Sequence, residues 1–473
     1  MSVNIDKNKT TVNLDEQKVY MSRVAKIVKK RWERPAACVV TYGCQQNVSD
    51  SERIRGMLMC MGFEFTDNTG DADVVIFNTC AVRGHAENRV FGNVGALKHI
   101  KQKKPDMIIA LCGCMMQQQH VAEKIRRSYP HVDIVFGTHV MHRLPEFLWN
   151  RLTGASRIFE LPDSDGEIIE GLPVHRDGSV RGFLSIMYGC NNFCSYCIVP
   201  YVRGRERSRD PEVIIREAEQ MVKAGYKDIT LLGQNVNSYG KGEPHGVNFA
   251  KLLRLLNEIE GDFRIRFMTS HPKDCTIELL DAMKDCEKVC RHLHLPFQCG
   301  SDRILKQMNR HYTKSDYLAL VEAAYERMPD LNLSSDVIVG FPGETYDDFL
   351  DTLDVVKKVG FTQLFTFIFS PRQGTPAAQL PDPVSRDEKV KWFEELLKVQ
   401  EEILQSKMHD MVGKTYRVLC EEPGRMEGLV CGRTSGNMVI EFKADISLIG
   451  SFADVKVTNA SNVIEGELVQ KIS

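Results

Sequence analysis

The sequence predicts an α/β protein in three parts: an N-terminal doubly wound (Rossmann-like) domain, a partial (β/α)6 barrel and a small C-terminal all-β barrel. Short apolar runs alternate with helical stretches over most of the chain, which is typical of βαβ units and parallel sheets. After about residue 409 the alternation gives way to short strands broken by Gly, Asn and Ser. The length of 473 residues leaves room for two or three separate cores.

The first domain is expected over residues 36–152. Its apolar runs, separated by helical stretches, are 38–42, 73–77, 107–111 and 133–136. Runs of this length between helices predict parallel strands in one doubly wound sheet. Residues 1–35 precede this domain as a basic extension, with nine Lys or Arg against four Asp or Glu.

The second domain is expected over residues 176–406, at the end of a polar linker. Six further apolar runs lie in it, at 183–187, 228–232, 264–268, 292–295, 333–339 and 363–369. Helical stretches separate most of these runs, so about six β/α units are predicted, enough for a partial barrel. The chemistry of such a barrel belongs at the C-terminal ends of its strands.

The third domain is expected over residues 409–473. Its predicted strands are 415–419, 428–431, 438–442, 452–458 and 465–469. Short alternating strands with Gly and Asn between them favour a small β-barrel. This part carries seven Lys or Arg and nine Asp or Glu, so any nucleic acid it binds must be held by a local patch or by shape.

Composition restricts the possible classes of protein. The net charge of −2 argues weakly against a nucleic-acid partner, because the basic residues are only locally concentrated, as in the cluster from Arg203 to Arg209. The sequence contains no run of about 18 apolar residues, so no membrane span is predicted. The N-terminus has no apolar signal region. We therefore expect a cytoplasmic protein with no membrane partner. In a reducing compartment, fifteen cysteines favour thiolate ligation of metal over disulfides.

The strongest motif is CNNFCSYC, which runs from Cys190 to Cys197 and includes Cys194. It begins directly after the first predicted strand of the second domain. Thiolates are the ligands that iron–sulfur clusters need, and three of them leave one iron without a protein ligand. An open position of this kind admits a substrate, as it does in catalytic zinc sites. A structural zinc knuckle is the alternative.

A second set of cysteines is dispersed. Cys44, Cys80 and Cys114 each follow one of the first three predicted strands of the first domain. Ligands of open α/β sheets gather at the carboxyl ends of the strands, so these thiols are expected to converge on a second site. Cys112 competes with Cys114, and we favour Cys114 because it lies beyond the strand, after Gly113. The other cysteines are interpreted as packing residues: Cys38, Cys60, Cys275, Cys286, Cys290, Cys299, Cys420 and Cys431.

These motifs resemble those of the radical-SAM methylthiotransferases, where SAM is S-adenosylmethionine. The resemblance rests on YGC ending at Cys44, NTC ending at Cys80, CGC ending at Cys114 and the YGCNNFCSYC run, and it covers residues 36 to about 470. Further stretches are similar to the tRNA-modifying branch: VPYVRG at 199–204, LLGQNVN at 231–237, GFPGE at 340–344 and FIFSPRQGTP at 367–376. The C-terminal barrel is similar to the TRAM domain, a tRNA-binding module.

The resemblance implies an enzyme with two 4Fe-4S clusters that adds a methylthio group to carbon 2 of isopentenyl-adenosine beside the anticodon of tRNA. The cluster on Cys190, Cys194 and Cys197 would cleave SAM to a 5′-deoxyadenosyl radical, which removes hydrogen from the adenine carbon. The dispersed triplet would hold the auxiliary cluster, which donates the sulfur that a second SAM methylates. A reducing electron donor is also implied.

The remaining site predictions are candidate contacts. For SAM they are Gln234, Asn235, Ser270, His271, Asp336, Gly340 and Gly343. For RNA phosphate they are Arg203 and Arg205, which lie just past the cysteine loop. Threonylcarbamoyl-adenosine in tRNA and an aspartate of a ribosomal protein are alternative substrates. A non-catalytic, metal-containing RNA-binding protein is an alternative of another class, and the sequence indicates no oligomeric state.

Overall fold

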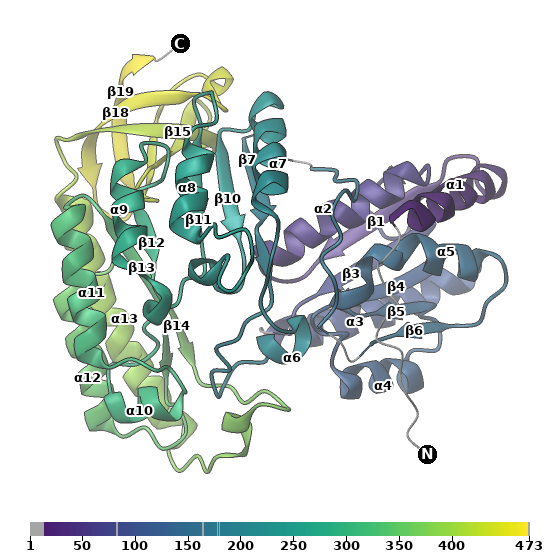
Figure 1. Cartoon of the computed structure of the whole chain (residues 1–473), viewed down its shortest axis with the longest axis horizontal. Helices are drawn as coiled ribbons and strands as arrows, with labels where there is room; N and C mark the ends of the chain where they lie inside the picture. The colour runs from purple at the N-terminus through teal and green to yellow at the C-terminus, as the bar shows by residue number, and fades with distance from the viewer. Residues whose placement is uncertain (1–13, 82–83, 163–164, 177, 179, 472–473) are drawn as a thin grey trace. The chain divides into compact units, whose positions relative to one another are not determined.

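The computed structural model describes residues 14–81, 84–162, 165–176, 178 and 180–471 (Figure 1). The chain divides into two compact units. The first contains Met1–Asp177 together with Val199–Arg205, and the second contains Gly178–Ile198 together with Glu206–Ser473. Among the described residues, no helix combines the length and apolar character needed to cross a membrane.

The first unit is built on a six-stranded parallel sheet with the strand order β2-β1-β3-β4-β5-β6. Its strands are β1 (Ala36–Thr41), β2 (Glu64–Phe65), β3 (Val74–Thr79), β4 (Ile108–Gly113), β5 (Ile134–Phe136) and β6 (Ile158–Glu160). Its helices are α1 (Leu14–Arg31), α2 (Gln45–Cys60), α3 (Gly84–Lys103), α4 (Gln119–Ser128), α5 (Leu144–Leu152) and α6 (Val199–Arg203).

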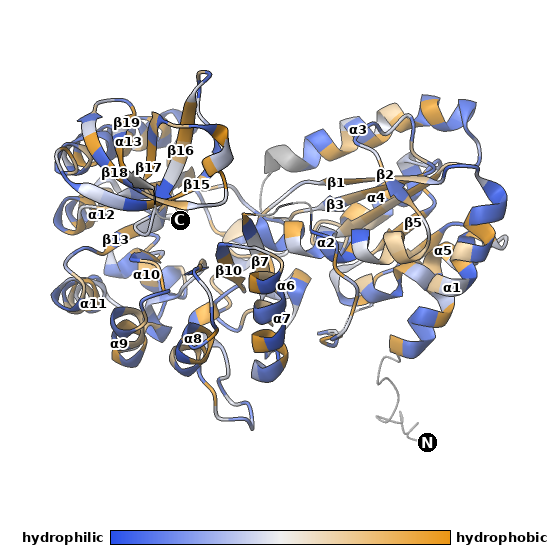
Figure 2. Ribbon diagram, turned by 90° about the horizontal axis from the view of Figure 1, so that it is seen from above, coloured by the Kyte–Doolittle hydropathy of each residue, from blue (hydrophilic) through white to orange (hydrophobic). Residues whose placement is uncertain are grey.

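Both faces of this sheet are buried, because side chains along each strand alternate between two cores. Val74 and Ile76 of β3 pack with residues of α1, α2 and α5, whereas Val75 and Phe77 pack with residues of α3 and α4. Figure 2 shows the apolar strands of this sheet with more polar helices around them. The arrangement is doubly wound, as the sequence predicts.

Two strands and one helix of the first unit were not expected from the sequence. β2 has two exposed residues and β6 has three half-buried ones, so neither forms the buried apolar run that predicted the equally short β5. Residues 14–31 of the basic extension form helix α1, which buries Met21, Val24 and Val28 against the sheet's first core. Residues 1–13 of that extension lie outside the described residues.

The second unit begins with six parallel strands in two hydrogen-bonded groups, β7-β10-β11 and β12-β13-β14. The strands are β7 (Arg181–Ser185), β10 (Asp228–Leu232), β11 (Arg264–Phe267), β12 (His292–His294), β13 (Asn332–Val339) and β14 (Gln363–Ile368). The helices are α7 (Pro211–Lys223), α8 (Phe249–Asn257), α9 (Ile277–Asp285), α10 (Asp302–Gln307), α11 (Lys314–Arg327), α12 (Tyr346–Val359) and α13 (Arg386–His409). A bridge from Ile265 to Val289 connects the two groups, which confirms the predicted partial barrel.

A short antiparallel ribbon of β8 (Met187–Tyr188) and β9 (Arg207–Ser208) closes the base of the cysteine loop. The loop itself follows β8, so the ribbon fixes where it leaves the barrel.

The C-terminal part of the second unit is a closed five-stranded barrel with the order β15-β16-β17-β19-β18. Its strands are β15 (Thr415–Pro423), β16 (Leu429–Thr434), β17 (Val439–Lys443), β18 (Phe452–Ala460) and β19 (Ile464–Lys471). This barrel is attached to the amino-terminal part of β11. Arg264 donates to the carbonyl oxygens of Arg433 and Arg417 at 2.6 Å each, and Arg266 donates to that of Thr434 at 2.8 Å.

Candidate functional site

The dispersed cysteines follow three adjacent strands of the first unit. Cys44 lies after β1 and occupies the N-cap position of α2, Cys80 follows β3, and Cys114 follows β4. The Cys44 and Cys80 thiols are hydrogen-bonded to each other. A Cβ added to Gly43 would lie only 2.8 Å from the Cβ of Cys80, so the first turn passes directly against the second. The carboxyl ends of the strands thus bring thiols together from distant parts of the sequence.

Asn47 holds Cys44 in place against the end of β3. Its Oδ1 accepts from the backbone N and the Sγ of Cys44, at 3.3 Å each. Its Nδ2 donates to Asn78 Oδ1 at 3.2 Å and to the Thr79 carbonyl at 3.3 Å. The orientation of Cys44 is therefore coupled to the strand that leads to Cys80.

Arg203 lies in the same cluster. Its Nε is 3.0 Å from the Sγ of Cys114, and its Nη2 is 2.7 Å from Oδ2 of Asp50. Hydrogen bonding to Cys80 lowers the pKa of Cys44 to about 6, with the Arg203 charge acting in the same direction. Burial raises the pKa of Cys114, and Arg203 opposes that rise.

These contacts correct the prediction that Arg203 binds RNA phosphate. The side chain is 6% exposed, and its guanidinium is already paired with a carboxylate and a thiol, so it presents no charge to solvent. Arg205 is exposed, and its backbone N donates to Oδ1 of Asp165 at 2.9 Å. For Arg205 the phosphate contact stays a prediction.

Cys112 and Cys114 lie in different surroundings. Cys112 is part of the hydrophobic core that contains Ala110 and Phe136, and burial there raises its pKa well above the usual value. Cys114 contacts Arg203 instead. The geometry thus groups Cys114 with Cys44 and Cys80, which supports the choice made from the sequence, while ligation itself stays a prediction.

The contiguous cysteines lie in the loop after β8. Cys190 and Cys194 are buried and Cys197 is half-buried. Asn192 Nδ2 is 3.5 Å from the Sγ of Cys190, and Arg310 Nη1 is 3.4 Å from the Sγ of Cys194. Burial raises the pKa of Cys190 to about 11, and the nearby Glu206 carboxylate adds to the rise.

A turn after α10 holds this loop from the other side. Ser195 donates from its backbone N to the Met308 carbonyl at 3.0 Å and from its Oγ to the Gln307 carbonyl at 2.8 Å. Asn309 Nδ2 donates to the Phe193 carbonyl at 3.0 Å. Phe193 adopts a φ of 46°, which is rare for a residue with a side chain. The Asn309 and Ser195 contacts stabilise the loop in this conformation.

The donor chemistry of both triplets fits iron–sulfur clusters. Each offers three thiols, and none of the fifteen cysteines is consumed in a disulfide. Among the described residues, no three His, Cys, Asp or Glu side chains are close enough together to hold one metal ion. A cluster binds each thiolate through a different iron, so its cysteines need not converge on one point.

Unpartnered polar atoms surround the predicted SAM contacts at the carboxyl ends of β10 and β11. Within the described residues, Asn235 Oδ1, Ser270 Oγ and His271 Nε2 are buried without a hydrogen-bond partner. Both polar atoms of the Asn237 side chain are also unpartnered. Buried polar groups are rarely left unpaired in native proteins, so this arrangement fits a polar ligand. Gln234 differs, because its Oε1 accepts from the backbone N of Gly189.

The other predicted SAM contacts have partners within the protein. Asp336 Oδ2 lies 3.6 Å from Nε2 of His294. The backbone N of Gly340 donates to the Glu344 carboxylate, and burial raises the pKa of that carboxyl to about 7. Gly340 and Gly343 have φ values of 72° and 80°, so the turn itself requires glycine. Their proposed contact with a ligand stays a prediction.

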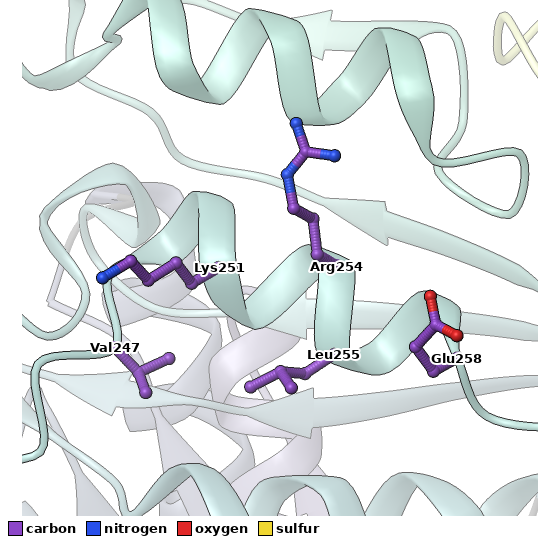
Figure 3. A pocket seen from close by; sticks show the side chains of 5 residues that line it. All are labelled: Val247, Lys251, Arg254, Leu255 and Glu258. Atoms are coloured by element: carbon purple, nitrogen blue, oxygen red, sulfur yellow. The ribbon is translucent and has the colours of Figure 1, made fainter.

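Three supporting residues were not found from the sequence: Asn47, Asn309 and Arg310. Asn309 and Arg310 touch the cysteine loop only through the tertiary fold, and Arg310 is 116 residues away from Cys194, so no spacing marks them. Asn47 is a local partner: it lies three residues after Cys44, at the capping-box spacing of helix α2, and this spacing is the signal that could have found it. A shallow hollow on the exposed side of α8, lined by Val247, Lys251, Arg254, Leu255 and Glu258, involves no predicted site residue (Figure 3).

Three family models match successive parts of the chain. Residues 36–137 match the model described as Uncharacterized protein family UPF0004, residues 184–356 match the Radical SAM superfamily, and residues 409–469 match the TRAM domain. These matches agree with the predicted fold class of each part.

Similar proteins extend over nearly the whole chain. A tRNA-2-methylthio-N(6)-dimethylallyladenosine synthase of Caldicellulosiruptor saccharolyticus is 52% identical over 432 residues, which cover 91% of this chain and 92% of the relative. A synthase of the same name from Acetivibrio thermocellus is 49% identical over 443 residues, which cover 93% and 92%.

Among solved structures, a radical S-adenosylmethionine methyltransferase from Kitasatospora setae aligns with a TM-score of 0.54. The alignment covers 72% of this chain and 75% of that one at 15% identity, so it supports the fold alone. The relatives decide the family: with about half of the residues identical over more than nine tenths of both chains, this chain belongs to the family of tRNA-2-methylthio-N(6)-dimethylallyladenosine synthases, within the radical SAM superfamily.

Proposed function

We propose that this chain is a tRNA methylthiotransferase that adds a methylthio group to carbon 2 of dimethylallyl-adenosine, also called isopentenyl-adenosine, next to the anticodon. Its cofactors are SAM and two 4Fe-4S clusters. One observation carries the proposal: a chain about half identical to synthases of this activity presents two thiol triplets, one in each unit. One triplet lies at the carboxyl ends of three parallel strands, and the other lies in the loop that follows the first barrel strand and β8. That placement is where α/β folds position reactive groups.

The two triplets have different roles in this proposal. Cys190, Cys194 and Cys197 would hold one cluster through their three thiolates, and SAM would bind to the iron that lacks a cysteine ligand. When bound, this cluster supplies the electron that cleaves SAM reductively to a 5′-deoxyadenosyl radical, which activates carbon 2 of the adenine. The second triplet holds the auxiliary cluster that takes part in sulfur transfer.

SAM is held by the polar atoms that lack partners at the ends of β10 and β11. Asn235 Oδ1 is a buried acceptor, and Ser270 Oγ is a buried hydroxyl that can donate or accept, so a polar ligand can form hydrogen bonds with both. Gln234 acts indirectly, because it binds the backbone of Gly189 at the start of the cysteine loop. We keep Asp336 and the turn from Gly340 to Gly343 as further candidates.

The substrate RNA is engaged by Arg205 and by the C-terminal barrel. Arg205 is exposed and lies eight residues beyond Cys197, so it is the remaining candidate for phosphate contact in that segment. A reducing partner supplies electrons. We propose that the reaction takes place in the cytoplasm, because the proposed substrate is tRNA and none of the cysteines forms a disulfide.

Mass spectrometry of tRNA nucleosides tests the proposal. Cells lacking this chain are expected to lose 2-methylthio-dimethylallyl-adenosine and to accumulate dimethylallyl-adenosine in its place. The wild-type chain should restore the modified nucleoside, whereas a variant with Cys190, Cys194 and Cys197 all replaced by Ala should not. Cys431→Ala serves as the matched control, because this half-buried cysteine lies in β16, outside both triplets.

The same measurement separates the alternatives. Loss of the methylthio group from threonylcarbamoyl-adenosine would identify that nucleoside as the substrate. An unchanged nucleoside profile, together with an unmodified aspartate in a ribosomal protein, would place the activity on protein. If no methylthio modification of either kind changes, the proposed function is wrong.

A further inference from the structure

Beside each cysteine triplet lies one buried arginine, whose guanidinium contacts the sulfur of one cysteine of that triplet. In the first unit, Arg203 Nε lies 3.0 Å from Cys114 Sγ. In the second unit, Arg310 Nη1 lies 3.4 Å from Cys194 Sγ. The two arginines are 5% and 4% exposed. A buried charge is costly unless it is paired, so both positions need an explanation.

The two arginines differ in how their charge is balanced. Arg203 forms an ion pair with Asp50, at 2.7 Å between two buried side chains. Arg310 donates to the Pro296 carbonyl at 2.7 Å and to the Tyr312 hydroxyl at 3.1 Å, which are both neutral groups. Within the described residues no carboxylate pairs with Arg310. Among the hydrogen-bond partners of Arg310 in the described part of the chain, the Cys194 sulfur is therefore the one that becomes an anion when it binds iron.

This difference has an electrostatic consequence for a bound cluster. Reduction adds a negative charge, and a nearby cation in a low-dielectric site stabilises the reduced state. An unbalanced arginine raises the reduction potential, whereas an arginine already paired with a carboxylate contributes little net charge. The same argument explains why the protein tolerates the cost of burying Arg310: the ligated thiolate is its counterion.

We propose that Arg310 is a positioning residue that raises the reduction potential of the cluster on Cys190, Cys194 and Cys197, and that Asp50 cancels the corresponding effect of Arg203 at the auxiliary site. The inference rests on the proposed cluster sites. It predicts that the two clusters differ in redox behaviour, because a carboxylate is paired with the arginine of one site and, among the described residues, none is paired with the arginine of the other.

Redox titration followed by electron paramagnetic resonance tests the first half. The measurement uses the full chain with Cys44, Cys80 and Cys114 replaced by Ala, so that only the loop cluster is observed. In this background Arg310→Gln should lower the ratio of reduced to oxidised cluster about tenfold at a fixed applied potential, which is about 59 mV for a one-electron couple. Arg310→Lys keeps the charge and should stay within about twofold of the parent.

A charge effect is contradicted if Arg310→Gln leaves the ratio unchanged or if Arg310→Lys lowers it as much as Arg310→Gln does. Should Arg310→Gln fail to retain iron, Arg310→Lys decides alone: a ratio within twofold supports the inference and a large fall overturns it. A parent chain that assembles no loop cluster overturns the proposed function, and this inference with it.

Asp50→Asn tests the second half, in a full chain with Cys190, Cys194 and Cys197 replaced by Ala. Removing the carboxylate charge leaves Arg203 unbalanced beside Cys114, so the ratio of reduced to oxidised auxiliary cluster should rise several-fold. This shift is opposite in sign to that of Arg310→Gln, and a merely structural role of Asp50 would not produce it. No rise, or a fall, overturns the compensation by Asp50.

Discussion

The loop triplet places its three thiols within eight residues of one another, whereas the dispersed triplet takes its thiols from positions 44, 80 and 114. The loop takes its thiols from one short segment, has the β8–β9 ribbon at its base and is held by the turn that follows α10. The dispersed triplet exists only when β1, β3 and β4 lie side by side in the sheet. The thiols of one site therefore come from a single segment, whereas those of the other come together only when the sheet folds.

The difference has a thermodynamic size. Bringing ends together costs conformational entropy that grows with the logarithm of the loop length. For separations of 36 and 34 residues, compared with four and three, the extra cost is about 4 kcal/mol in an unfolded chain. The sheet of the first unit removes this cost in advance, because the folded strands already hold the three turns together.

The two sites are also supported in different ways. Backbone carbonyls of the Gln307–Met308 turn accept from Ser195 and so hold the loop. In the dispersed site the turns themselves are packed together, with Gly43 against Cys80 and Asn47 between two strand ends. We expect point changes in the loop to affect one cluster only, and changes in the turns of the first unit to affect its geometry as a whole.

The largest expected effect is that of Cys190→Ala. Without this thiol the loop cannot hold the cluster that binds SAM, so formation of 5′-deoxyadenosine should fall by on the order of a thousandfold or more. Roughly half of the iron should be retained, because the dispersed triplet is untouched. Iron analysis and chromatography of the reaction products measure both quantities. Continued formation of 5′-deoxyadenosine would contradict the assignment of the loop triplet.

The next effect separates Cys114 from Cys112. Cys114→Ala should remove the auxiliary cluster and stop methylthio transfer while reductive cleavage of SAM continues. Cys112→Ala should cost only stability, because Cys112 packs in the core beside Ala110 and Phe136. Iron content and tRNA nucleosides are measured for both variants. If Cys112→Ala loses the cluster and Cys114→Ala keeps it, the third ligand is Cys112.

Patterns that act over short distances were readable from the sequence. The apolar runs predicted β1, β3, β4 and β5 of the first sheet and the six strands of the barrel, and the fold class is confirmed. Helix α1 was missed, although Met21, Val24 and Val28 have helical spacing. The basic residues around these three led us to interpret the segment as an extension, and the short buried apolar face of the helix was therefore overlooked.

Contacts that depend on the tertiary fold were not readable. Arg203 was interpreted as a phosphate ligand because it lies just past the cysteine loop, but its partners Asp50 and Cys114 are 153 and 89 residues away. Nothing in the local sequence distinguishes a buried, paired arginine from an exposed one. Arg310 was missed for the same reason. Cysteine positions at strand ends were predictable, because the βα alternation itself defines where strands end.

The smallest expected effect is that of Gly43→Ala, which tests whether the dispersed site depends on the close approach of its turns. Gly43 has a φ of 156°, and a Cβ there would lie 2.8 Å from the Cβ of Cys80 and 2.4 Å from Oδ1 of Asn47. The Asn47 amide can rotate away, but Cys80 Cβ is attached to the end of β3. Overpacking of this kind costs about 1–3 kcal/mol.

We expect Gly43→Ala to release iron from the auxiliary site about tenfold faster in the presence of a chelator, while the loop cluster and SAM cleavage are unaffected, because a cost of about 1.4 kcal/mol corresponds to a factor of ten. Gly92→Ala is the matched control: Gly92 lies in helix α3 with no atom within 4 Å of an added Cβ, so alanine there should be neutral or slightly stabilising. Equal rates of iron release from the two variants would show that the turns of the dispersed site can accommodate a Cβ at position 43. The contrast with the loop would then rest on chain separation alone, and not on how tightly the turns are packed.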